Sequence, residues 1–177
     1  MKMEALDVLK NRRSIRKFKQ EQVKDEELAL VLEAGTCAPT ASGTQGCKIV
    51  VVQEEESLAA VRKLNAKVLG RPSADPDPYY GAPTILIVFA TPESHAPHRD
   101  GAAVMTNLLN AAYAVGLASC WIDRPIQMFE MPEGKALLKK WGLSEDLQGV
   151  ASIALGYADM PDPQPKERKA DYITWIK

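Results

Sequence analysis

Three arginines and one serine lie within five residues near the start of the chain, at Arg12, Arg13, Ser14 and Arg16. Each guanidinium is a planar fork of donors that matches phosphate oxygens, and it stays charged at any working pH. So dense a positive cluster repels itself unless water screens the charges or an anion lies beside them. The spacing therefore predicts either a phosphate site or a solvated basic turn, and most charge clusters are ordinary surface.

A second basic cluster lies near the other end of the chain, at Lys166, Arg168 and Lys169. If the fold brings the two clusters together, they form a pocket for a dianion. Residues 39–45 are mostly small, with hydroxyls and accessible backbone amides. A loop of this composition can lie close to a flat ligand and hydrogen-bond its polar edge.

Other familiar kinds of site find little support. The chain has no G-x-G-x-x-G, G-x-x-x-x-G-K-[ST] or G-x-S-x-G motif. His95, His98 and Asp100 are close in sequence, but no further soft ligand lies near them, which disfavours a metal site. Cys37 and Cys47 are predicted to be buried, inert thiols rather than redox centres.

The composition is that of one ordinary globular domain. The chain has 177 residues, of which 46% are hydrophobic and 25% are charged. Its net charge of −1 argues against a protein that coats nucleic acid. The apolar runs are too short for a signal peptide or a membrane span, and the odd number of cysteines fits a reducing compartment. We therefore expect a cytoplasmic protein with neither a membrane nor a nucleic-acid partner.

The apolar periodicity predicts the helices and strands that would position these groups. Helices are predicted at 25–38, 55–69, 100–116 and 132–141, and strands at 48–53, 84–90, 118–122 and 150–157. The strand 84–90 is apolar throughout, which indicates burial on both faces. The helix 100–116 is apolar over more than one stripe, so it should be buried in the domain or at a subunit interface. Residues 70–81, rich in proline and glycine, are predicted to form a mobile loop and the candidate lid.

Residues 158–177 differ from the domain formed by residues 1–157. Three prolines within this segment favour extended backbone, and residues 172–176 are largely apolar and β-prone. Exposing an apolar segment of this kind to water is unfavourable, and such segments usually mark an interaction site. We expect the arm to dock on another chain, most economically on the sheet edge of a partner subunit.

Five segments, in order and with natural spacing, resemble the nitroreductase family of flavoenzymes. They read NRRSIRKF at 11–18, APTASGTQ at 38–45, YYGAPTILIVFA at 79–90, DGAAVMTNLLNAAYAVGLASCWI at 100–122, and LGYAD at 155–159 followed by PKERK at 165–169. The resemblance covers nearly the whole chain. It implies an α+β fold with a mixed, mainly antiparallel sheet flanked by helices. It also implies a homodimer that exchanges C-terminal arms and holds two FMN molecules at its interface.

The resemblance further implies which residues bind FMN: Arg12, Arg13, Ser14, Arg16, Pro39, Thr40, Ala41, Gly43, Asp123, Arg124, Lys166 and Arg168. Arg12 and Ser14 would face the phosphate and ribityl groups with Arg13 beside them, and Lys166 and Arg168 would close over the phosphate. The small-residue loop would border the flavin ring from the other subunit. The backbone at 123–124 would pass the flavin N5, and Arg16 would approach the N1 and O2 edge.

No protein nucleophile is implied. Hydride would pass from NADH or NADPH through flavin N5 to an electron-poor acceptor, such as a nitroaromatic or a quinone, by a ping-pong mechanism. A cation fixed at the N1 and O2 edge stabilises the negative charge that collects there, so Arg16 would tune the redox potential. The alternatives are other flavin chemistry, such as dehydrogenation or flavin breakdown, and FMN binding without efficient turnover.

Two departures from the family pattern bear on the substrate more than on the cofactor. The chain reads Gly-Thr-Gln-Gly-Cys at 43–47, where many members read N-x-Q-P-W. This change removes an amide and an aromatic ring from the edge of the pocket. In addition, Arg124 stands where glycine is common, so a large cation follows the strand.

Overall fold

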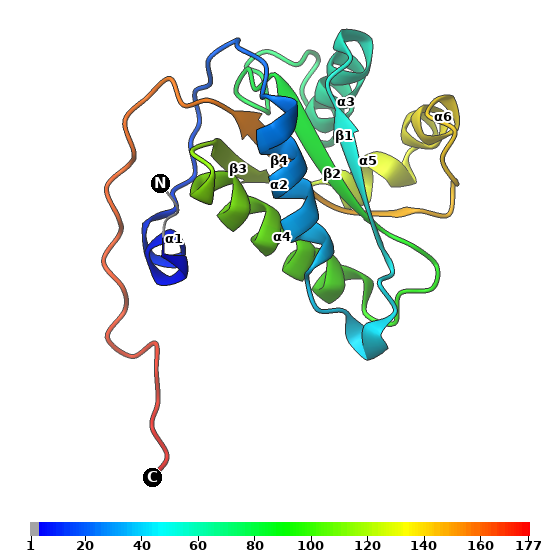
Figure 1. Ribbon diagram of the computed structural model, residues 1–177. Helices are drawn as coiled ribbons and strands as arrows, with labels where there is room; N and C mark the ends of the chain where they lie inside the picture. Colours follow the sequence, from blue (N-terminus) through cyan, green and yellow to red (C-terminus); the bar gives the residue numbers. More distant parts are fainter. Residues whose placement is uncertain (1–3) are drawn as a thin grey trace.

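The computed structural model describes residues 4–177. Its centre is a four-stranded antiparallel sheet in the order β1-β2-β4-β3 (Figure 1). The strands are β1 (Cys47–Val52), β2 (Thr84–Ala90), β3 (Ala118–Ile122) and β4 (Gln148–Gly156). The helices are α1 (Ala5–Asn11), α2 (Asp25–Thr36), α3 (Glu55–Val68), α4 (Pro97–Ala114), α5 (Pro125–Glu130) and α6 (Pro132–Lys140), with a 3-10 turn at Ala41–Gly43.

Helices cover both faces of the sheet. On one face α2 and α4 lie side by side (Figure 1), and their apolar residues, among them Val31 and Leu108, pack against Leu86 of β2. On the other face α3, α5 and α6 supply a second cluster, in which Phe129 packs edge-on against Phe89. Because both faces are covered, every residue of β2 is buried, as its continuous apolar run predicts.

The α+β class is confirmed, and the sheet is antiparallel along all of its named strands. Among residues 4–177, parallel pairing is limited to an isolated bridge between Ser14 and Ser119. The periodicity does not predict α5, because a helix of six residues is too short to show a helical repeat. Arg124, at the N-terminal end of α5, has a left-handed backbone with a φ of 90°.

Helix α4 is the central helix that its apolar circumference predicts. It begins at Pro97, three residues earlier than the periodicity indicates, because proline suits the first turn of a helix. It packs against all four strands and against α1 and α2. None of the helices described over residues 4–177 combines the length and the apolar character needed to cross a bilayer.

Beyond β4 the chain leaves the sheet as an extended arm (Figure 1). Its base is held by a bridge between Phe18 and Ala158 and by the Asp159 N–H, which donates to the Lys17 carbonyl at 3.0 Å. Trp175 near its end is 76% exposed, and residues 172–176 form no strand within their own chain. The division at residue 158, the dimer and the exchange of arms therefore stay predictions.

Candidate functional site

The basic segment 12–16 lies along the outer edge of β3. The Ile15 N–H donates to the Ser119 carbonyl at 3.0 Å, next to the Ser14–Ser119 bridge. Ile15 itself is buried in the core and anchors the segment. The apolar residue that interrupts the basic run is therefore what holds its charged neighbours against the sheet.

Arg12, Ser14 and Arg16 converge on Cys120 of β3. Burial raises the pKa of the Cys120 thiol, while the Arg16 charge, a hydrogen bond from Ser14 and the Arg12 charge act in the opposite direction. Arg12, Ser14 and Arg16 therefore lie in the surroundings of Cys120, near enough to act on its thiol. The structure thus gathers three of the predicted cofactor residues around one position of an edge strand.

Arg12 and Arg13 have different surroundings. Arg13 donates through Nη1 to the Lys10 and Arg12 carbonyls, each at 2.9 Å, and so caps the last turn of α1. Arg12 is half-buried, and its pKa is lowered first by burial and then by the positive charge of Arg13. No carboxylate within residues 4–177 forms an ion pair with Arg12. Its charge is therefore only partly solvated and has no ion-pair partner among the described residues.

A pocket of about 200 Å³ lies beside these two arginines, between the end of α4 and the base of the arm. Its lining includes Arg12, Arg13, Tyr113, Ser119 and Asp162. The Ser119 hydroxyl is buried and has no hydrogen-bond partner in the part of the chain that the structure describes. Arg12, which forms no ion pair among residues 4–177, and Ser119, whose hydroxyl is unpaired, therefore line one pocket. Guanidinium and hydroxyl donors suit a phosphate group, although Asp162 adds one negative charge to the same lining.

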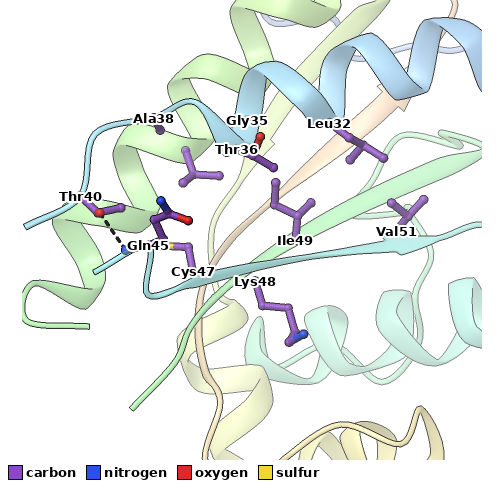
Figure 2. A pocket seen from close by; sticks show the side chains of 11 residues that line it. Leu32, Gly35, Thr36, Ala38, Thr40, Gln45, Cys47, Lys48, Ile49 and Val51 are labelled. Atoms are coloured by element: carbon purple, nitrogen blue, oxygen red, sulfur yellow. Dashed lines mark hydrogen bonds between the residues drawn. The ribbon is translucent and has the colours of Figure 1, made fainter. Parts of the chain in front are cut away.

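The small-residue loop is held at the other end of α4. The Ala41 N–H donates to Asp100 Oδ1 at 2.9 Å, and the Ser94 hydroxyl donates to Asp100 Oδ2 at 3.0 Å. The Gln45 N–H donates to Thr40 Oγ1 at 2.9 Å (Figure 2). Three loop residues, Ser42, Gly43 and Gln45, have positive φ angles, so the loop depends on these bonds for its shape. Pro39 and Gly43 are exposed, whereas Thr40 and Ala41 are half-buried.

The sequence places Asp100 beside two histidines and at the start of the predicted helix 100–116, but it does not indicate this contact. The signal that could have revealed it is an acid in the first turn of a strongly apolar helix, where the helix dipole favours a carboxylate.

The loop and the arginine cluster do not meet within one chain. Asp100, which holds the loop, and Tyr113, which borders the arginine pocket, are thirteen residues apart on α4. At 1.5 Å per residue the two positions are separated by about 20 Å along the helix axis.

A pocket of about 410 Å³ lies between the end of α2 and β1 (Figure 2). Gln45 and Cys47 lie side by side in it, whereas Lys48 points to the opposite side of β1. Burial raises the pKa of the Cys47 thiol, and the charge of Asp100 raises it further, so this thiol is poorly nucleophilic. The prediction of burial is wrong for Cys37, which is exposed because it follows the last turn of α2.

The candidate lid at 70–81 is anchored along its second half. The Asp77 carboxylate accepts hydrogen bonds from Arg62 Nε at 2.9 Å and from the Tyr79 and Gly81 N–H groups at 2.8 Å. Tyr79 is fully buried. The second half of this loop is therefore held to the domain, and residues 71–76 are the part that is mostly exposed. The role of the loop as a lid stays a prediction.

The remaining predicted residues lie apart from the arginine cluster in sequence. Asp123 is exposed and Arg124 is half-buried just after β3. Lys166 and Arg168 are exposed on the arm, and neither forms an ion pair in the described chain. The convergence of this arm on Arg12 stays a prediction. Over residues 4–177 no three His, Cys, Asp or Glu side chains come together as a metal ion would require.

The fold and the site together define an α+β protein with a basic pocket at one edge of an antiparallel sheet. The sequence profile of the Nitroreductase family matches residues 9–157, and the chain belongs to that family. The family assignment drawn from the five segments is therefore confirmed.

Two crystal structures and one curated sequence are similar over nearly the full length. A nitroreductase of Bacteroides fragilis with bound FMN is 30% identical, with a TM-score of 0.88, over 99% of this chain and 100% of its own. A nitroreductase of Desulfitobacterium hafniense with bound FMN is 25% identical, with a TM-score of 0.85, over 100% of both chains. A protein of Archaeoglobus fulgidus, provisionally named an NADH dehydrogenase/NAD(P)H nitroreductase, is 29% identical over 96% of this chain and 90% of its own.

Proposed function

We propose that this chain is an FMN-dependent oxidoreductase that takes hydride from NADH or NADPH and delivers it to an electron-poor acceptor, such as a nitroaromatic or a quinone. Family membership and the FMN in two similar structures support the cofactor. The observation that carries the proposal is the half-buried Arg12, which forms no ion pair among residues 4–177 and lines a pocket together with Ser119, whose hydroxyl is unpaired.

Each predicted residue then has a physical task. Arg12 and Ser14 bind the phosphate and ribityl groups, and Lys166 and Arg168 neutralise the remaining phosphate charge. Arg16 is exposed near Cys120, where a fixed cation stabilises negative charge on the adjacent ring edge. When bound, FMN supplies the redox chemistry, accepting hydride from the nucleotide and releasing it to the acceptor in a ping-pong cycle. For a nitro group, one hydride and one proton from solvent give a nitroso group and water, because the hydride carries the electron pair.

We also propose a homodimer with exchanged arms. The loop at 39–45 and the arginine cluster lie at opposite ends of α4, so a second copy would be needed to bring both to one ring. Within the described residues β1 pairs only with β2, which leaves one edge of the sheet available beside the 410 Å³ pocket. The exposed apolar end of the arm has the composition to cover such an edge. The three free cysteines fit a cytoplasmic location.

The purified protein should be yellow or take up FMN, and NADH or NADPH should bleach the flavin under anaerobic stopped flow. Arg12→Gln should weaken FMN binding by about tenfold or more, the equivalent of one charge-assisted hydrogen bond. Lys139→Gln, which removes an exposed charge from α6, should leave FMN affinity unchanged. A colourless protein that binds no added FMN would refute the proposal. Binding of FMN without bleaching would indicate a flavin-binding protein instead.

A further inference from the structure

A fully buried amide connects the end of β3 to helix α3. Arg124 Nε donates to Asn65 Oδ1 at 2.9 Å. The Asn65 amide nitrogen lies 3.4 Å from the Asp123 carbonyl and 3.3 Å from the Tyr79 hydroxyl. One side chain therefore holds the backbone of Asp123 and the guanidinium of Arg124 at the same time.

The hydrogen bonds beyond Asn65 continue in one direction. The Ser152 hydroxyl donates to the Ile122 carbonyl at 3.1 Å, so it accepts from the Tyr79 hydroxyl, which is 3.0 Å away. Tyr79 in turn accepts from Asn65. Burial, the largest influence, raises the pKa of Tyr79 to about 12, which keeps its hydroxyl protonated as the chain of donors requires. Asn65, Tyr79 and Ser152 are all fully buried.

The network fixes Arg124 but does not neutralise it. Arg124 is half-buried, and none of the ion pairs formed by residues 4–177 includes it. Its bond to the protein uses Nε, so the two terminal amino groups of the guanidinium remain for another acceptor. A φ of 90° is unfavourable for a residue with a side chain, and the buried network maintains it. The guanidinium is thus oriented before any ligand arrives.

Arg124 also lies on the same edge of the sheet as the arginine cluster. Cys120, where Arg12, Ser14 and Arg16 converge, is four residues earlier in the chain. At 3.2–3.4 Å per residue, the two positions are at most about 13 Å apart along an extended chain. A cofactor with its phosphate near Arg12 and its ring extended along β3 would bring the ring toward Arg124.

We propose that Arg124 is a specificity-determining residue of the acceptor site and that it selects acceptors carrying an oxyanion, such as a carboxylate. This inference rests on the proposed function and on the family resemblance, which implies that the backbone at 123–124 passes the flavin N5. The phosphates of NADH and NADPH are oxyanions as well. The experiment therefore measures the kinetic constants of both the acceptor and the reducing nucleotide. Asn65 and Tyr79 are positioning residues, since they act on the ligand through Arg124.

The test compares 4-nitrobenzoate with 4-nitrobenzamide, which have similar shapes and differ in charge. The two nitro groups differ in intrinsic reactivity, so the informative quantity is the change in the kcat/KM ratio between wild type and Arg124→Gln. We expect that ratio, benzoate over benzamide, to fall about tenfold through a higher KM for the benzoate. A higher KM for NADH or NADPH alone would assign the same oxyanion recognition to the nucleotide.

A second variant separates positioning from packing. Tyr79→Phe keeps the ring and removes the hydroxyl that joins Asn65 to Ser152, so the ratio should fall by a smaller factor with FMN content unchanged. Tyr80→Phe is the matched control, because Tyr80 is exposed and its hydroxyl takes no part in the network. The ratio should not move in this variant.

The inference fails if Arg124→Gln binds FMN normally and leaves both the acceptor ratio and the nucleotide KM unchanged. Calorimetric titration with 4-nitrobenzoate compares wild type with Arg124→Gln without turnover. Equal affinities of the two proteins for 4-nitrobenzoate would also overturn the inference. Absence of bleaching by NADH and NADPH in wild type refutes the proposed function instead, so the two failures are distinguishable.

Discussion

Asp100 offers the sharpest test of how the small-residue loop is held. Asp100→Ala removes the acceptor of the Ala41 N–H and of the Ser94 hydroxyl, two bonds that the structure places at 2.9 and 3.0 Å. The Ala41 N–H is then left without its partner next to a small cavity. Hydrogen bonds to a charged group contribute about 1.5–3 kcal/mol each, so a loss of about 3 kcal/mol is expected after partial relaxation. For a chain of this size that lowers Tm by roughly 6–12 °C.

Asp100→Asn provides a graded comparison. The Asn oxygen can still accept from Ala41, and its amino group can donate to the Ser94 hydroxyl, so only the charge is lost. We expect a cost of about 1 kcal/mol, close to that of an ordinary neutral hydrogen bond. Asp146→Asn, an exposed control, should leave Tm unchanged.

Thermal unfolding followed by circular dichroism, with and without FMN, measures these effects. If the loop borders the flavin, Asp100→Ala should also weaken FMN binding about tenfold, whereas Asp100→Asn should do so less. An Asp100→Ala protein whose Tm lies within about 2 °C of wild type would show that the loop does not depend on this carboxylate.

Three further outcomes follow from contacts described above or from packing around α6. Gly134→Ala should lower Tm by several degrees, because a Cβ there would lie 2.1 Å from the Met128 carbonyl oxygen; unchanged unfolding would contradict this packing. Deleting residues 172–177 should convert a dimer to a monomer in light scattering, and a truncated dimer would exclude the arm as its main support. Since the folded-state pKa of Tyr79 is about 12 against an ordinary value of 10.0, its protonated form stabilises the fold below pH 10. That contribution, on the order of 2–3 kcal/mol, is lost as pH rises from 10 to 12. Phenylalanine has no proton to lose, so the free energy of unfolding should fall less in Tyr79→Phe than in wild type over this window. Urea titrations at pH 10 and pH 12 measure both values.

The sequence predicts most of the sheet and its helices because their signals are local. Residues 85–90 form a continuous apolar run, and the strand in the structure spans 84–90. The basic run at 12–16 is equally visible, and the structure gathers three of its side chains at Cys120. What the run does not show is that Arg13 caps α1 while Arg12 is left without a counter-ion.

The polar contacts that shape the rest of the site are not local. Asp100 binds Ala41 and Arg124 binds Asn65, and in each pair the residues are 59 positions apart in sequence. A single polar residue within an apolar pattern does not show which residue it will bind when that residue is 59 positions away in the sequence. Sequence reasoning therefore identified the charged surface of the site but missed the buried network behind Arg124.

The length of α4 has a genetic consequence. If each catalytic centre takes its arginine cluster from one chain and its loop from the other, two variants that bind FMN weakly can complement one another at limiting FMN. In a mixed dimer of Arg12→Gln with Asp100→Ala, one centre inherits both lesions and the other inherits neither. When equal amounts of the two variants exchange subunits at random, about half of the dimers are mixed, so about a quarter of all centres are intact. A monomer with a complete site would show no such recovery.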